Sequence, residues 1–161
     1  MAASALIDES IARVQNLAAD LRPGALDHLG LAAALAQRAR QFQRRSGVEC
    51  TLDVAEPMPA LPSVVADELF YIFQEALTNV TRHAQATKVQ VRLGVQEGGV
   101  RLEIEDNGIG IDPEAVTALR SLGLLGMREP ALHCRGSVRF ESASPRGTVV
   151  VVEVPLHEVP A

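Results

Sequence analysis

The sequence predicts an α+β fold, with helices layered on one face of a mainly antiparallel sheet of about five strands. After two leading helices, the hydrophobic pattern gives the order strand, helix, strand, strand, helix, strand, strand. Strands that follow one another directly usually pair antiparallel. Hydrophobic residues make up 47% of the 161 residues, but aromatic residues only 3%. This composition favours a single domain with an aliphatic core.

Two helices are expected before the first strand. Between residues 6 and 21, apolar side chains recur at spacings of three and four, which is the period of an amphipathic helix. Arg22-Pro23-Gly24 interrupts this pattern. A second helix is expected over residues 26–45 and ends at Ser46-Gly47, a typical helix terminus.

The middle of the chain predicts a strand followed by a long helix. Residues 48–54 alternate between apolar and polar, like a half-buried strand, and the proline-rich residues 56–62 form a loop. Ser63 is a good N-cap, and acidic residues follow it near the positive end of the helix dipole. The helix is therefore expected to run from Ser63 to about residue 84.

The second half predicts two strand pairs with helices between them. Residues 88–95 and 100–106 form a hairpin, and residues 137–142 and 148–154 complete the sheet. Between these pairs we expect a short helix at 113–121 and another at 123–134. Pro130 lies inside the latter pattern, so we expect a kink or a shorter helix there.

Composition excludes several classes of function. The net charge of −5 and the scattered basic residues argue against a nucleic-acid partner. Cys50 and Cys134 lack the spacing of a metal site, so free thiols in a reducing cytoplasm are expected. No apolar run reaches the roughly 20 residues that span a bilayer, so no membrane segment is expected in this chain.

Glu75 and Asn79 are the first candidate site residues. They lie four apart on the long helix, so their side chains are neighbours at the border of its apolar stripe. An amide oxygen suits Mg²⁺, and a carboxylate can accept a proton or orient a water beside that metal. For the helix alone, a solvated polar pair is the better explanation.

Asp106 and the glycines after it are the second candidate. Asp106 ends a strand on the side of its apolar residues, where a carboxylate needs a partner. The exocyclic amine of adenine would be such a partner, whereas guanine has a carbonyl at that position. Gly108 and Gly110 would let the backbone approach a flat base. The alternative is an ordinary turn, because Asp-Asn-Gly is a strong turn sequence.

A phosphate cradle is the third candidate. The chain contains neither a P-loop nor a dinucleotide fingerprint. Gly123, Leu124, Gly126 and Met127 open a helix whose first N–H groups could bind phosphate. Viewed by itself, this segment is equally an ordinary helix start.

Four motifs in order resemble the ATP-binding domain of sensor histidine kinases, which belongs to the ATPase superfamily shared with gyrase (the Bergerat fold). Residues 73–84 resemble the N box of that family, Asp106–Gly110 its G1 box, residues 123–129 its G2 box, and residues 146–148 its closing glycine-threonine element. Each motif is moderately specific alone. Together they cover most of the chain from about residue 21 onward.

The resemblance implies a two-layer α/β sandwich, with an incomplete sheet beneath three helices. It implies that Asn79 binds Mg²⁺ and that Glu75 positions water or acts as a base. Asp106 would bind the adenine amine, and Thr148 would support it through water. His83 and Lys88 would lie near the phosphates, although His83 could instead be a packed residue at a helix end. The base pocket and its lid would be shaped by Gly108, Gly110, Gly123, Leu124, Gly126 and Met127.

The resemblance extends to a subclass and a domain division. Leu21-Arg22-Pro23 and the downstream Leu29-Gly30-Leu31 resemble kinases of the nitrate-sensor type, which have a short ATP lid, here residues 111–122. Residues 1–22 would then be the end of a dimerisation and phosphoacceptor helix. Residues 23–161 would be the ATP-binding catalytic domain.

None of the four histidines fits a phosphoacceptor site, which requires a helical histidine followed by an acidic residue. They are His28, His83, His133 and His157. We therefore expect an ATP-dependent kinase domain that donates the γ-phosphoryl group to a histidine outside this chain, and through it to a response regulator.

The full-length protein is expected to be a homodimer, either cytoplasmic or anchored in the membrane. This chain, with half of the helical bundle missing, is expected to be a monomer. An alternative function is an anti-sigma-factor-like regulatory module of the same superfamily, which binds ATP and a protein partner.

Overall fold

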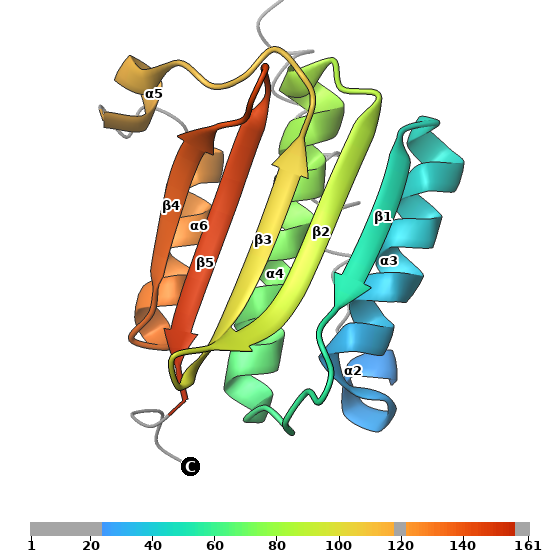
Figure 1. Ribbon diagram of the computed structural model, residues 1–161, viewed down its shortest axis with the longest axis vertical. Coiled ribbons are helices and arrows are strands. Elements are labelled where there is room, and N and C mark those ends of the chain that lie inside the picture. The colour runs from blue at the N-terminus through green and yellow to red at the C-terminus, as the bar shows by residue number, and fades with distance from the viewer. Residues whose placement is uncertain (1–23, 118–121, 157–161) are drawn as a thin grey trace, which may run out of the picture.

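The computed structural model describes residues 24–117 and 122–156 and shows one sheet with helices on one of its faces (Figure 1). The sheet order is β1-β2-β3-β5-β4. The strands are β1 (Glu49–Val54), β2 (Lys88–Gln96), β3 (Gly99–Asp106), β4 (Ser137–Ser142) and β5 (Thr148–Pro155). Only β1 and β2 pair parallel, so the expectation of a mixed, mainly antiparallel sheet of about five strands is confirmed.

Three long helices cover the sheet, as expected, and lie behind it in Figure 1. They are α3 (Gly30–Ser46), α4 (Ser63–Asn79) and α6 (Leu122–His133). Two short helices, α2 (Gly24–His28) and α5 (Pro113–Thr117), lie at the ends of the layer. None of the helices in the described part of the chain is long and apolar enough to cross a membrane.

Helix boundaries differ from the expectations at three places. The helix expected over 26–45 is broken at Leu29, and Gly30 follows with a positive φ of 83°. The long helix changes at Val80 into a π-helical turn, η1 (Val80–Ala84). α6 runs through Pro130 to His133, so the expected shortening does not occur. The expected helix at residues 6–21, and with it the proposed division at residue 22, lies outside the described residues.

The core lies between the helices and the inward face of the sheet. Along β3, every second residue is buried, from Val100 to Asp106. The inward residues of β2 alternate in the same way, starting at Val89. α4 supplies the other layer through a face that includes Leu69, Ile72 and Phe73, all fully buried. The aliphatic core predicted from the composition is confirmed.

The outer face of the sheet is charged. Arg92 pairs with Glu103 and Glu105, Arg101 with Glu103 and Glu153, and Arg139 with Glu153 and Glu141. We call these residues the outer-face network. Opposite charges on neighbouring strands stabilise strand pairing. Hydrogen bonds from the arginines lower the pKa of Glu103 and Glu153.

We expect Glu103→Gln to lower the free energy of unfolding at pH 7 by about 0.2–1 kcal/mol, the range for exposed ion pairs. The pKa of Glu103 is lowered in the folded protein from its ordinary value of 4.5. Its contribution is therefore complete above pH 4.5 and is lost as the pH falls through the folded pKa.

Urea unfolding at a series of pH values tests this prediction, with Glu129→Gln on α6 as the control. The difference between Glu103→Gln and wild type should shrink as the pH is lowered below 4.5. A difference that stays constant over this range would mean that the network contributes nothing through charge.

Candidate functional site

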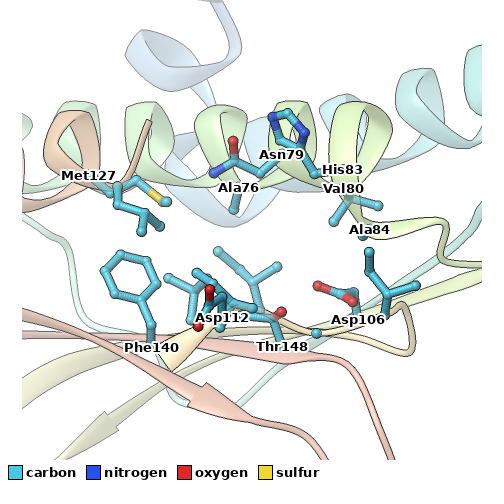
Figure 2. A pocket seen from close by; sticks show the side chains of 16 residues that line it. Ala76, Asn79, Val80, His83, Ala84, Asp106, Asp112, Met127, Phe140 and Thr148 are labelled. Carbon is cyan, nitrogen blue, oxygen red and sulfur yellow. The ribbon is translucent and has the colours of Figure 1, made fainter. Parts of the chain in front are cut away.

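A cavity of about 220 Å³ lies between the end of α4 and the inward face of the sheet. In Figure 2, residues of α4 and η1 form its upper wall, and residues of the sheet form its floor. Its remaining walls come from the loop after β3 and from α6. The lining is mostly apolar and comprises Ala76, Asn79, Val80, His83, Ala84, Ile104, Asp106, Ile109, Gly110, Ile111, Asp112, Leu124, Met127, Phe140, Thr148 and Val150.

Seven of the predicted site residues line this cavity. They come from three separate stretches of sequence and from the start of β5, and they are Asn79, His83, Asp106, Gly110, Leu124, Met127 and Thr148. The fold thus brings together the four sequence motifs around one space. Glu75, Gly108 and Gly123 do not line it but contact the residues that form it.

Asp106 is the one buried charged residue in residues 24–117 and 122–156, with 7% of its surface exposed. The backbone N–H of Gly108 donates to its Oδ1 over 2.8 Å. Burial raises the pKa of Asp106, and the nearby backbone N–H groups of Gly108 and Thr148 act in the opposite direction by favouring the charged form. The carboxylate also lines the cavity, so its other lone pairs can accept a hydrogen bond from a ligand there.

The loop after β3, which we call the glycine loop (Asp106–Gly110), lies directly against the end of η1. The N–H of Ile109 donates to the carbonyl of Ala84 over 2.8 Å. A Cβ on Gly108 would overlap that same carbonyl oxygen. Gly110 has a positive φ of 88°. Gly108 is therefore required by its close approach to Ala84, and Gly110 is favoured by its positive φ. An ordinary Asp-Asn-Gly turn would not need the contact with Ala84.

The π-helical turn η1 (Val80–Ala84) ends the upper wall of the cavity. The hydroxyl of Thr81 donates to the carbonyl of Leu77 inside the helix. Gln85 then takes a left-handed conformation with a φ of 51°. This geometry places His83 on the cavity wall while leaving it exposed to solvent. No pattern in the sequence predicts this π-helical turn, a feature that often marks a functional site.

Glu75 and Asn79 face the start of α6. Both are half-buried. A Cβ on Gly123 would lie 2.9 Å from Oε1 of Glu75 and 3.1 Å from Oδ1 of Asn79. Asn79 therefore lies on the cavity wall, and Glu75 lies next to it against the start of α6. The two side chains are not a fully solvated face of the helix.

These residues fit a magnesium ion that is shared with a phosphate ligand. Mg²⁺ keeps several waters and needs only one or two protein ligands beside phosphate oxygens. Oδ1 of Asn79 is a suitable hard ligand on the cavity wall. In the described part of the chain, no three His, Cys, Asp or Glu side chains gather as a metal cluster.

Lys88 is bonded to the glycine loop through its backbone, but it does not line the cavity. Its neighbour Val89 points into the core, so the alternation of β2 turns Lys88 to the outer face. There its ammonium pairs with Glu49 of β1 over 3.4 Å. The expectation that Lys88 lies near a phosphate does not agree with this position. Gly126 also lies outside the cavity lining.

Much of the cavity wall could not be predicted from the sequence. Ile104 and Val150 could be assigned to the core from strand alternation, but not to a pocket. Phe140 of β4 reaches the far end of the cavity, where the guanidinium of Arg128 lies 6.0 Å from its ring centroid. Asp112 also lines the cavity and caps α5 by accepting a hydrogen bond from the N–H of Glu114. No motif singles out these positions.

The fold thus places a largely apolar cavity, with one buried carboxylate, between a helix and one face of a sheet. Residues 64–158 match the family described as "Histidine kinase-, DNA gyrase B-, and HSP90-like ATPase". This match includes more than half of the chain, and the protein belongs to that family.

Its similar curated relatives are sensor histidine kinases. The chain is 35% identical over 151 residues to the sensor histidine kinase MctS of Rhizobium johnstonii, covering 92% of this chain and 32% of that protein. It is 34% identical over 159 residues to the oxygen sensor histidine kinase NreB of Staphylococcus carnosus, covering 96% of this chain and 44% of that protein. The chain thus spans less than half the length of these two relatives, which favour the kinase over the anti-sigma-factor alternative.

Solved structures share the fold. The histidine kinase domain from the Erythrobacter litoralis EL346 blue-light activated histidine kinase has a TM-score of 0.69 at 23% identity, covering 80% of this chain and 62% of that one. The ATP binding domain of PrrB from Mycobacterium tuberculosis has a TM-score of 0.62 at 24% identity, covering 80% of this chain and 93% of that one. These likenesses support the two-layer α/β architecture.

We expect Gly108→Ala to disrupt the site and Gly126→Ala to be tolerated. The new Cβ at residue 108 would collide with backbone, so the glycine loop or η1 must move. At residue 126, a Cβ would meet no described atom within 4 Å, and alanine favours a helix over glycine by about 1 kcal/mol.

Thermal unfolding together with nucleotide titration measures both effects. Gly108→Ala should lose stability or nucleotide affinity, and Gly126→Ala should keep both. Wild-type behaviour of Gly108→Ala would refute the close packing of the glycine loop against Ala84.

Proposed function

We propose that this chain is the catalytic domain of a sensor histidine kinase. It binds ATP with Mg²⁺ and supports transfer of the γ-phosphoryl group to a histidine outside these residues, and from there to a response regulator. The observation that carries the proposal is the buried carboxylate of Asp106 on the floor of an apolar cavity. A buried carboxylate requires a donor, and adenine supplies one on a flat, apolar ring.

Base recognition follows from the geometry around Asp106. Its Oδ1 already accepts the N–H of Gly108, so the carboxylate is oriented before a ligand enters. The amine of adenine would donate to it, whereas the carbonyl of guanine would face a second acceptor and be repelled. Ile104, Ile109 and Val150 would bury the faces and edges of the base.

Phosphate and metal binding would take place on the helical side of the cavity. Asn79 would hold Mg²⁺ through its amide oxygen, and Glu75 would orient a water or accept a proton beside it. His83 would approach the phosphates from the exposed end of η1. The first N–H groups of α6, near Gly123, would add donors and a favourable helix dipole. When bound, Mg²⁺ neutralises charge on the phosphates and helps orient the transferred group.

The wider assembly is part of the same proposal. The full-length protein would be a homodimer whose helical phosphoacceptor domain presents the histidine to this domain. ATP, that domain and a response regulator would be its partners. The ATP-binding domain would act in the cytoplasm, including in a full-length protein anchored in a membrane.

The adenine contact predicts a preference for ATP over GTP that depends on Asp106. Asp106→Asn replaces one acceptor oxygen with a donor, which conflicts with the amine or with the N–H groups of Gly108 and Thr148. Loss of a charged hydrogen bond costs about 1.5–3 kcal/mol, or roughly 10- to 100-fold in affinity.

Calorimetry with ATP and GTP, each with Mg²⁺, measures this preference. Asp53→Asn, a change on exposed β1, is the matched control and should bind ATP like wild type. Equal binding of ATP and GTP by the wild type would rule out the adenine assignment, as would undiminished ATP binding by Asp106→Asn.

The metal assignment predicts that Asn79→Ala removes the Mg²⁺ dependence of ATP binding. The wild-type affinity should fall when Mg²⁺ is removed by a chelator, whereas the variant should bind ATP equally with and without the metal. Gln74→Ala removes an amide from the same helix outside the cavity lining and should behave as wild type. The assignment fails if Asn79→Ala keeps the full Mg²⁺ dependence.

A further inference from the structure

The segment that enters β5 contacts the glycine loop at three successive residues. Nε of Arg146 donates to the carbonyl of Gly108 over 2.9 Å. Gly147 lies so close to the carbonyl of Asp106 that any Cβ would overlap it, and its φ is 122°. Thr148 pairs with Asp106 across the two strands, and its backbone N–H favours the charged form of the Asp106 carboxylate. Of these three residues, Arg146 is the one that contacts the glycine loop through its side chain.

The contact from Arg146 completes a clamp on one peptide unit. The peptide between Gly108 and Ile109 has its N–H bonded to the carbonyl of Ala84, 2.8 Å away. Its carbonyl accepts from Arg146. This peptide is thus held between the end of η1 on one side and the β4–β5 connection on the other. Rotation of the peptide would break both bonds.

The clamp is coupled to the carboxylate of Asp106. The N–H of the same Gly108 donates to Oδ1 of Asp106 over 2.8 Å. Because Gly108 lacks a side chain, its backbone dihedrals are weakly restricted by local sterics. The side chain of Asn107 anchors the chain before Gly108 by accepting from the N–H groups of Thr87 and Lys88, and the clamp on the following peptide holds the chain after it. Arg146 itself does not line the cavity.

We propose that Arg146 is a positioning residue for base recognition. It fixes the glycine loop so that the carboxylate of Asp106 meets the 6-amino group of the base, without touching the nucleotide itself. This role rests on the proposed adenine contact of Asp106. A guanidinium suits the task because it stays charged at any physiological pH, and its bond to a carbonyl is charge-assisted.

The role predicts a selective loss of affinity. Arg146→Ala should weaken ATP binding by about tenfold, the value of one charge-assisted hydrogen bond. Inosine triphosphate carries a carbonyl in place of the amine, so the carboxylate of Asp106 repels it as it would the carbonyl of guanine, and a fixed carboxylate gives this nucleotide no advantage. Its affinity should therefore not fall by more than about twofold, the scatter of substitutions that touch no specific interaction. Arg146→Lys should recover part of the ATP affinity, because an ammonium can still donate to the carbonyl of Gly108.

Calorimetry with ATP-Mg²⁺ and inosine triphosphate-Mg²⁺ on wild type, Arg146→Ala and Arg146→Lys tests the proposal. Arg40→Ala on α3 removes the same charge far from the cavity and should bind both nucleotides like wild type. Unchanged ATP affinity in Arg146→Ala overturns the proposal. Equal weakening for both nucleotides also overturns it, because the residue would then act on the shared triphosphate or on general stability.

Amide hydrogen exchange of the nucleotide-free protein tests the clamp independently of binding. Exchange at Ile109 should be faster in Arg146→Ala than in wild type and Arg40→Ala, because its bond to Ala84 depends on the held peptide. Unchanged exchange overturns the clamp. A wild-type chain that binds no ATP would instead refute the proposed function, and with it the recognition role, while the exchange result would still report on the clamp.

Discussion

The buried carboxylate of Asp106 is the constraint on which the rest of the site depends. A carboxylate that is 7% exposed needs hydrogen-bond donors, and two backbone N–H groups near it favour its charged form. One comes from Gly108 in the following loop. The other comes from Thr148, which the antiparallel register of β3 and β5 places directly opposite Asp106. The sheet therefore both buries this charge and orients it toward the cavity.

The two layers divide the chemistry of the cavity between them. The sheet side offers apolar walls and one fixed acceptor, which suits a flat base with an amine. The helical side offers Asn79 and His83, with Glu75 behind them against Gly123. The layers meet closely because the glycine loop can touch the carbonyl of Ala84 only where no Cβ intervenes. Because the helices cover only one face of the sheet, its other face is exposed to solvent. The charged residues of the outer-face network make that exposed face polar.

Much of the architecture followed from local patterns. Strand alternation and helical periodicity gave the five strands and three covering helices, because burial on one face imposes a period of two on strands and 3.6 on helices. The π-turn at Val80–Ala84 and the break at Leu29 were missed, since both arise from packing contacts that periodicity does not report. The resemblance implied that Lys88 lies near the phosphates, whereas its side chain pairs with Glu49, because the alternation of β2 turns it to the outer face.

By itself, the sequence determined the class of fold, an aliphatic core and four motifs that resemble one ATPase family. It left Glu75 and Asn79 ambiguous between a solvated face and a site, and Asp106 between a turn and a binding residue. Tertiary structure decided where these side chains lie: Asp106 is buried at the cavity and Asn79 is on its wall, with Glu75 beside it. Burial and neighbours across a cavity depend on residues far apart in sequence, so local patterns do not report them. It also revealed the contact from Arg146 to Gly108, which joins residues 38 positions apart. Only folding brings such residues within hydrogen-bonding distance.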